Sequence, residues 1–237
     1  MKAIIKTMTK NSQAFCQSGM GLVAISALLF ACKGTLIKYI FTLGASVEDV
    51  MILRLLFAMP VYVWVVLQGL RREYHGLSMT HIASASGVGI VGYYLASYLD
   101  LQGLQTVSAG LERIILYTYP VFVVLLSASF LKRAISLPLC LCIAMTYAGL
   151  FMAFYADIHA DHNAVMADVL KGSVYVLLSA LAFSFYVIGS DYCMRYFSSA
   201  LFTAIAMLAA ASVMTVHYAI TQTAAHLLGL SSRVYFW

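Results

Sequence analysis

Seven long apolar stretches alternate with short polar segments along the chain. Each stretch is long enough for a membrane-spanning helix, which needs about 20 apolar residues. The runs are continuous rather than alternating in polarity, so they predict helices and not the strands of a membrane barrel. The predicted spans are residues 20–43, 47–69, 79–99, 107–131, 136–156, 173–194 and 199–221.

The amino-acid composition agrees with this pattern. Hydrophobic residues make up 63% of the chain and charged residues 10%. That share of apolar side chains is far above what a soluble domain hides in one core. The sequence therefore predicts an all-α integral membrane protein that is surrounded by the lipid bilayer.

The charges between the spans predict how the chain is oriented in the membrane. Cations lie before the first span and after the second, fourth and sixth, at Lys2, Lys6, Lys10, Arg71, Arg72, Lys132, Arg133 and Arg195. The other connections carry mostly acids, at Glu48, Asp49, Asp100, Asp157, Asp161 and Asp168. Cytoplasmic segments hold the Lys/Arg excess, so the N-terminus is expected in the cytoplasm. The net charge of +5 reflects this asymmetry and does not indicate nucleic-acid binding.

The sequence also suggests an internal repeat. Residues 26–30 align with residues 179–183, and the register holds without gaps across two spans and the connection between them. Spans one and two would then correspond to spans six and seven. Five spans separate the two copies, an odd number, so the second copy is inverted. Inverted repeats are typical of secondary transporters, whose substrate site lies near the midplane between the halves.

The connection after the third span and the start of the fourth carry a more specific pattern. Within residues 103–120, the most characteristic parts are Ser108-Ala109-Gly110-Leu111-Glu112-Arg113 and Tyr119-Pro120. This region resembles EamA-type transporters of the drug/metabolite transporter superfamily, and the resemblance extends from about Gly21 to Trp237. It implies two inverted five-helix repeats in a ten-helix fold, with both termini cytoplasmic, in a bacterial-type inner (plasma) membrane. It also implies export or uptake of small metabolites. No cofactor is expected.

The resemblance divides the chain into four segments. Residues 1–18 are expected to be a cytoplasmic segment and residues 19–156 the first repeat, with helices one to five. Residues 157–172 are expected to be an outer loop. Residues 173–237 would form an incomplete second repeat with helices six and seven, and the chain would end at the start of an eighth helix.

Five charged side chains lie inside the predicted spans: Lys33, Lys38, Arg54, Glu112 and Arg113. Each costs about 2.5–3.5 kcal/mol at the centre of a spanning helix, so each needs a partner or a wet cavity. One interpretation is a cavity in which Glu112 neutralises part of the positive charge and the surplus binds an anionic group. The other is a structural pair, Glu112 with Arg54 or Arg113, while Lys38 reaches the headgroups.

Helical spacing adds polar neighbours to these charges. Ser108 and Tyr119 share the face of Glu112, Tyr117 shares that of Arg113, and Tyr94 lies one turn before Tyr98 in the third span. The candidate substrate pathway is therefore Lys33, Arg54, Tyr94, Ser108, Glu112, Arg113, Tyr117 and Tyr119.

Other kinds of site are not supported by the sequence. The acids and histidines between Asp157 and His162 are close neighbours in one loop without a second cluster, so no metal site is expected. The chain carries no phosphate-binding loop and no spacing that supports a Ser/His/Asp nucleophile. Neither an enzyme nor an ATP-driven pump is predicted.

Two functional hypotheses remain. The first is a secondary transporter that works by alternating access, driven by a proton gradient or by exchange. Its partners would be a small metabolite, anionic or zwitterionic because of the positive surplus, together with protons and a second copy of the chain as further candidates. The second hypothesis is a non-transporting protein, either a truncated remnant or a membrane subunit that needs a partner to complete its fold.

Overall fold

The computed structural model describes residue 28 and residues 32–73, 78–131, 137–160 and 166–222. All of the regular structure in these ranges is helical. A helix over residues 32–42 comes first. It is followed by α2 (Val47–Glu73), α3 (Met79–Gly89), η1 (Ile90–Leu95), α4 (Ala96–Leu104), α5 (Ala109–Leu116), α6 (Tyr119–Leu131), α7 (Leu137–Ala160), α8 (Met166–Cys193) and α9 (Ser199–Thr221).

Five helical runs are long and apolar enough to cross a membrane: Val47–Gly69, Met79–Leu104, Ala109–Ser129, Met166–Cys193 and Ser199–Thr221. These confirm the second, third, fourth, sixth and seventh predicted spans as candidate spans. Of the predicted first span, 20–43, residues 20–27 and 29–31 lie outside the described residues, and residues 32–42 are helical. The predicted fifth span corresponds to α7, within which the described residues give a shorter apolar helix, Cys140–Gly149.

Two predicted boundaries differ from the structure. The third span continues to Leu104 instead of ending at residue 99, so placing Asp100 in a connecting segment was wrong. The span continues because Leu101 and Leu104 are buried within the protein and the Asp100 carboxylate has a partner there, Lys33. The expected loop 157–172 is also shorter, since α7 ends at Ala160 and α8 begins at Met166. Asp168 lies in the first turn of α8, where a carboxylate stabilises the helix N-terminus.

The third span is interrupted by a π-helical segment, η1, between α3 and α4. A π turn holds one residue more than an α turn, and such segments are frequent at functional sites. Here the backbone N–H of Ala96 donates to the carbonyl of Val91, five residues earlier. The insertion brings Gly92 and Tyr93 to the inner face of the helix bundle, where both line a cavity.

The fourth span is broken in its middle. Tyr117 ends α5 and α6 starts at Tyr119. Thr118 stabilises the break, because its hydroxyl donates to the carbonyl of Ile115 at 2.7 Å and its own carbonyl accepts from the N–H of Val121 at 2.9 Å. Pro120, which has no N–H to donate, lies in the first turn of α6, where it is tolerated best.

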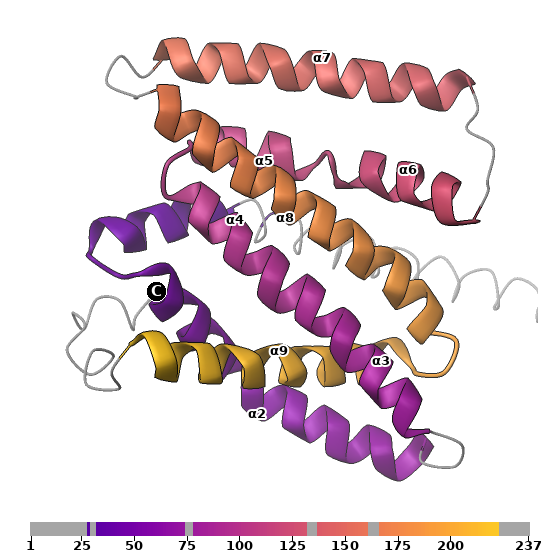
Figure 1. Cartoon of the computed structure of the whole chain (residues 1–237). Helices are drawn as coiled ribbons and strands as arrows, with labels where there is room; N and C mark the ends of the chain where they lie inside the picture. Colours follow the sequence, from indigo (N-terminus) through magenta and orange to yellow (C-terminus); the bar gives the residue numbers. More distant parts are fainter. Residues whose placement is uncertain (1–27, 29–31, 74–77, 132–136, 161–165, 223–237) are drawn as a thin grey trace, which may run out of the picture.

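The helices pack in pairs that are distant in the sequence. Helix α4 lies along α8, and α2 and α3 lie along α9, whereas α7 lies at the periphery against α5 (Figure 1). Small residues allow the close contacts. A Cβ added at Gly89 would lie 2.6 Å from the carbonyl oxygen of Ala206, and one added at Gly103 would lie 2.7 Å from that of Gly172. This is the small-residue packing expected between membrane helices.

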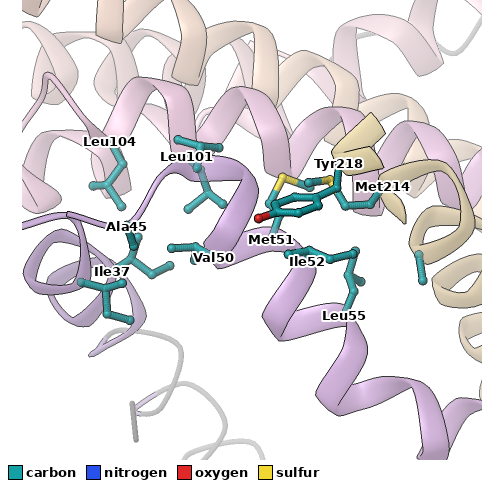
Figure 2. Close-up of a cluster of buried hydrophobic side chains, with 13 residues drawn as sticks. Ile37, Ala45, Val50, Met51, Ile52, Leu55, Leu101, Leu104, Met214 and Tyr218 are labelled. Carbon is teal, nitrogen blue, oxygen red and sulfur yellow. The ribbon is translucent and has the colours of Figure 1, made fainter. Parts of the chain in front are cut away.

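The largest buried cluster joins the helix over 32–42 to α2, α4 and α9 (Figure 2). Met51, Leu101, Leu104 and Met214 are completely buried in it. Its polar edge is Asp49, which is 0% exposed. The Asp49 carboxylate accepts hydrogen bonds from Ser46 and, at 2.8 Å, from the hydroxyl of Tyr218 on α9. The start of α2 is therefore fixed to the end of α9.

Candidate functional site

A cavity of about 520 Å³ lies among the described spans. Its volume falls in the range of pockets that hold small molecules, about 300–1,000 Å³. Charged, hydroxyl and aromatic side chains line much of its wall. The lining residues are Lys33, Arg54, Ala58, Tyr62, Gly92, Tyr93, Ala96, Ser97, Asp100, Leu116, Tyr117, Tyr119, Ser179, Phe183 and Met207.

The irregular parts of the spans form much of this wall. Gly92 and Tyr93 come from the π segment of the third span. Leu116, Tyr117 and Tyr119 come from the break in the fourth span. In membrane proteins, interrupted helices are tolerated where they line a cavity, because their backbone groups find partners there. The geometry of the two interruptions therefore fits a cavity within the membrane-spanning part.

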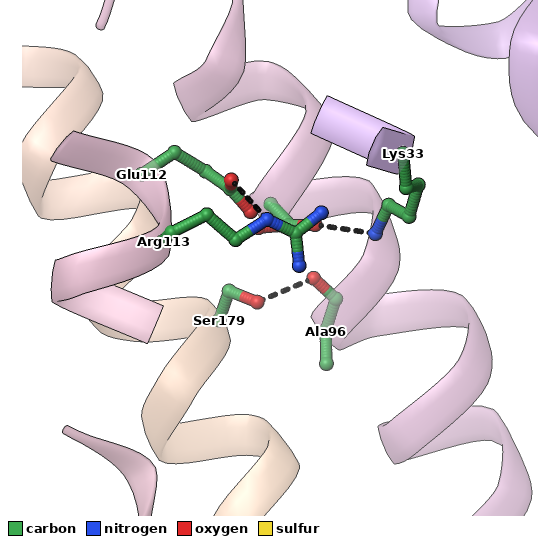
Figure 3. Close-up of polar contacts among 6 residues, drawn as sticks. Lys33, Ala96, Glu112, Arg113 and Ser179 are labelled. Atoms are coloured by element: carbon green, nitrogen blue, oxygen red, sulfur yellow. Dashed lines mark hydrogen bonds and ion pairs between the residues drawn. The ribbon is translucent and has the colours of Figure 1, made fainter. Parts of the chain in front are cut away.

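Two of the lining residues form an ion pair. The Nζ of Lys33 lies 3.1 Å from Oδ2 of Asp100, and the side chains are 24% and 5% exposed (Figure 3). It connects the helix over 32–42 to α4. Because both residues lie within apolar helices, the pair reduces the cost of holding either charge in the membrane.

A second pair of charges lies beside this ion pair. The Nε of Arg113 is 3.2 Å from Oε2 of Glu112, and the two side chains are 12% and 0% exposed (Figure 3). Gly34 makes room for them, since a Cβ at this position would lie 3.3 Å from Oε2 of Glu112. The alternative in which Glu112 pairs with Arg113 as a structural pair thus agrees with the observed contact.

Arg54 differs from these two cations. It lies in α2 and lines the cavity, where Asp100 attracts it electrostatically. Neither ion pair nor hydrogen bond joins its guanidinium to a residue in the described ranges. The lining thus contains two cations, Lys33 and Arg54, and one anion, Asp100, which gives a net charge of +1.

Helix α8 forms another part of the wall and is hydrogen-bonded to the interrupted helices. Ser179 donates to the carbonyl of Ala96 at 2.7 Å, and Ser184 donates to the carbonyl of Tyr119 at 2.9 Å. Tyr186 and Tyr93 share a hydrogen bond of 2.9 Å between their hydroxyls. These contacts hold α8 against both interruptions, so the cavity wall is built from segments far apart in the sequence.

The structure divides the eight residues of the predicted pathway into two groups. Four of them line the cavity together: Lys33, Arg54, Tyr117 and Tyr119. The other four do not line it: Tyr94, Ser108, Glu112 and Arg113. Tyr94 points to α9, where its hydroxyl lies 2.9 Å from Nδ1 of His217. Ser108 caps α5 by accepting from the N–H of Leu111 at 3.0 Å.

The sequence interpretation missed five polar residues of the cavity wall: Tyr62, Tyr93, Ser97, Asp100 and Ser179. Asp100 could have been found from the charges alone. The predicted spans hold four cations and a single acid, Glu112, so further acidic partners were to be sought. Asp100 directly follows the predicted third span and is the acid next to it in the sequence. Tyr93 could not have been placed, because an uninterrupted helix would turn it to a different face from the one that η1 gives it.

Apolar helices long enough to cross the bilayer, packed around a charged cavity, define a multi-pass membrane protein of the transporter class. A family model described as the EamA-like transporter family matches residues 17–155. The chain belongs to this family of the drug/metabolite transporter superfamily, which is not a family of enzymes.

One relative extends over most of the chain. The uncharacterized transporter YcbK of Bacillus subtilis (strain 168) is 28% identical over 209 residues, which are 87% of this chain and 65% of the relative. The chain thus spans about 65% of the length of this relative. No solved structure matches the chain.

Proposed function

We propose that the protein is a secondary transporter that moves a small metabolite across the cell inner membrane, with the cavity as its substrate site. The observation that carries this proposal is the cavity itself. It is lined by charged residues of three helices, Lys33, Arg54 and Asp100, and by the interrupted parts of two spans. Broken helices around a polar site near the middle of the membrane are a recurring feature of secondary transporters.

The proposed mechanism is alternating access between two inverted repeats, residues 19–156 and 173–237. Two observations support it. Helix α2, the second span, packs along α9, its proposed counterpart in the second repeat. Serine side chains cap both helices, Ser46 at α2 and Ser198 at α9. Equivalent helices that meet across a pseudo-twofold axis are expected to pack in this way, and rocking about that axis would expose the cavity to either side.

The proposed orientation places the N-terminus in the cytoplasm, on the basis of the cations between the spans. Lys33, Arg54 and Asp100 then lie in the middle or outer half of the membrane. The substrate would be anionic or zwitterionic because the cavity lining is net positive. Transport would be driven by protons or by exchange for a second metabolite, and assembly as a homodimer is part of the same proposal.

Transport is tested with the full chain purified and reconstituted in proteoliposomes. Counterflow of radiolabelled amino acids and small carboxylic acids is measured for the wild type, for Ser97→Trp and for Ser212→Trp. Ser97 lines the cavity, so a tryptophan there fills it. Ser212 is an exposed residue of α9 and serves as the matched control.

We expect the wild type and Ser212→Trp to accumulate at least one solute and Ser97→Trp to fail. Equal accumulation by both variants would show that the cavity is not the pathway. If a folded wild type accumulates none of the solutes, the result favours the second hypothesis, a membrane subunit that does not transport by itself.

A further inference from the structure

Arg54 is the one cation of the cavity lining to which the described residues offer no ion-pair partner. Lys33, the other cation of the lining, is held by Asp100 at 3.1 Å. Arg113 lies outside the lining and is held against Glu112 at 3.2 Å. Arg54 therefore contributes the net positive charge of the cavity.

A charge inside a spanning helix is expensive, and intramembrane cations almost always face a partner or a substrate path. Asp100 influences Arg54 electrostatically, but its Oδ2 is engaged by Lys33. An anion that enters the cavity can supply the missing partner. A guanidinium is well suited to this role, because its planar fork binds a carboxylate through two parallel hydrogen bonds.

The rest of the lining indicates what the anion is attached to. Five aromatic rings surround the cavity, those of Tyr62, Tyr93, Tyr117, Tyr119 and Phe183. Tyr119 and Phe183 pack edge to face, with ring centroids 5.0 Å apart and an interplanar angle of 87°. Tyr117 is 54% exposed and offers its ring to the cavity. Such walls favour a flat ring that stacks on them or meets them edge on.

We propose that the cavity binds a monocarboxylate with one aromatic ring, whose carboxylate is held by Arg54 and whose ring packs among these tyrosines. Lys33 stays with Asp100 and is not part of the anion site. A single excess charge selects a monoanion over a dianion, since a second carboxylate would meet Asp100 without a free cation. This inference rests on the proposed function, because it names the substrate class of the same cavity.

The experiment measures binding rather than transport. Thermal unfolding of the full chain in detergent is followed while benzoate, benzamide, acetate or phthalate is added. We expect benzoate to raise Tm saturably, because a ligand that binds the folded state stabilises it. Benzamide lacks the charge, acetate lacks the ring and phthalate adds a second charge, so each is expected to have a smaller effect at equal concentration.

Substitutions then assign the anion site. Arg54→Gln is expected to weaken the apparent benzoate affinity by about tenfold or more, as the loss of a charge-assisted hydrogen bond predicts. Arg54→Lys should lose less, and it keeps the test informative if Arg54→Gln does not fold. Lys38→Gln is the matched control, because Lys38 is a half-buried cation of the helix over 32–42 that does not line the cavity. Tyr117→Leu should weaken benzoate binding and leave the response to acetate unchanged.

Several results would overturn the proposal. It fails if benzamide stabilises the protein as much as benzoate, if phthalate or acetate matches benzoate, or if Arg54→Gln and Arg54→Lys bind benzoate like the wild type. The same proteoliposomes separate this failure from failure of the proposed function. If a neutral or cationic solute is transported and Arg54→Gln transports it equally well, the proposed transport function stands and the proposed carboxylate site is wrong. If benzoate binding depends on Arg54 but no solute is transported, the carboxylate site stands and the proposed transport function is wrong.

Discussion

Lys33 and Asp100, which are 67 residues apart in the sequence, form an ion pair between two helices, with 3.1 Å between Nζ and Oδ2. Each residue is the other's charge partner in an apolar environment. The pair therefore explains why an acid is present so far along the third span and a lysine within the first helix. It also fixes the helix over 32–42 against the part of α4 that borders the cavity.

Asp100→Asn should destabilise the protein by about 3 kcal/mol. Removing one partner from a buried pair costs about 3–5 kcal/mol, and Lys33 is 24% exposed, which places the expected value at the lower end. Unfolding by SDS in mixed micelles measures the change. Asp191→Asn is the control, because its 3.9 Å pair with Arg195 is exposed and should be dispensable. Equal stability of Asp100→Asn and the wild type would contradict the assigned role of the pair.

Gly89→Ala and Gly87→Ala should have opposite effects although they lie two residues apart in α3. A Cβ at Gly89 would overlap Ala206 of α9, with its carbonyl oxygen only 2.6 Å away, so we expect a loss of about 1–3 kcal/mol. A Cβ at Gly87 meets nothing within 4 Å. There, alanine should stabilise the helix by about 0.5–1 kcal/mol through its higher propensity. The same SDS titration compares the two, and a tolerated Gly89→Ala would mean that α3 and α9 are not in close contact.

Tyr218→Phe removes a hydroxyl that donates to Oδ1 of Asp49 at 2.8 Å. Hydrogen bonds to charged groups contribute about 1.5–3 kcal/mol, so a loss of stability in this range is expected. Tyr175→Phe is the matched control, since no hydrogen bond joins the Tyr175 hydroxyl to the described residues. If the two variants unfold alike, the contact between α2 and α9 does not depend on this hydrogen bond.

The regular spans could be predicted from the sequence because continuous apolar runs have few alternatives in lipid. The seventh span, 199–221, agrees with α9 at both ends. The interruptions could not be predicted in the same way. Proline within a helix favours a kink, but the full break at Pro120 also depends on Thr118, whose hydroxyl donates to the carbonyl of Ile115. The π segment has no comparable signal among its residues, Ile90–Leu95.

The candidate site could be predicted only in part, because the sequence shows which charges lie in apolar runs but not which of them meet. Lys33 and Arg54 stand out as charges in apolar runs, and both line the cavity. Glu112 stands out equally, yet it does not line the cavity and contacts Arg113 instead. Helical spacing gives the face of a residue within its own helix. Which neighbouring helix that face meets depends on tertiary packing, and single-sequence reasoning does not determine it.

The π segment makes the third span sensitive to its length. Each residue of an α-helix turns the chain by about 100° and advances it by about 1.5 Å. Deletion of one residue within η1 would therefore leave Ala85 and Gly89 facing α9 but rotate Asp100 and Gly103 away from their partners. Two chains that share every residue type around the cavity, but differ by one residue in this segment, would present different side chains to the solute.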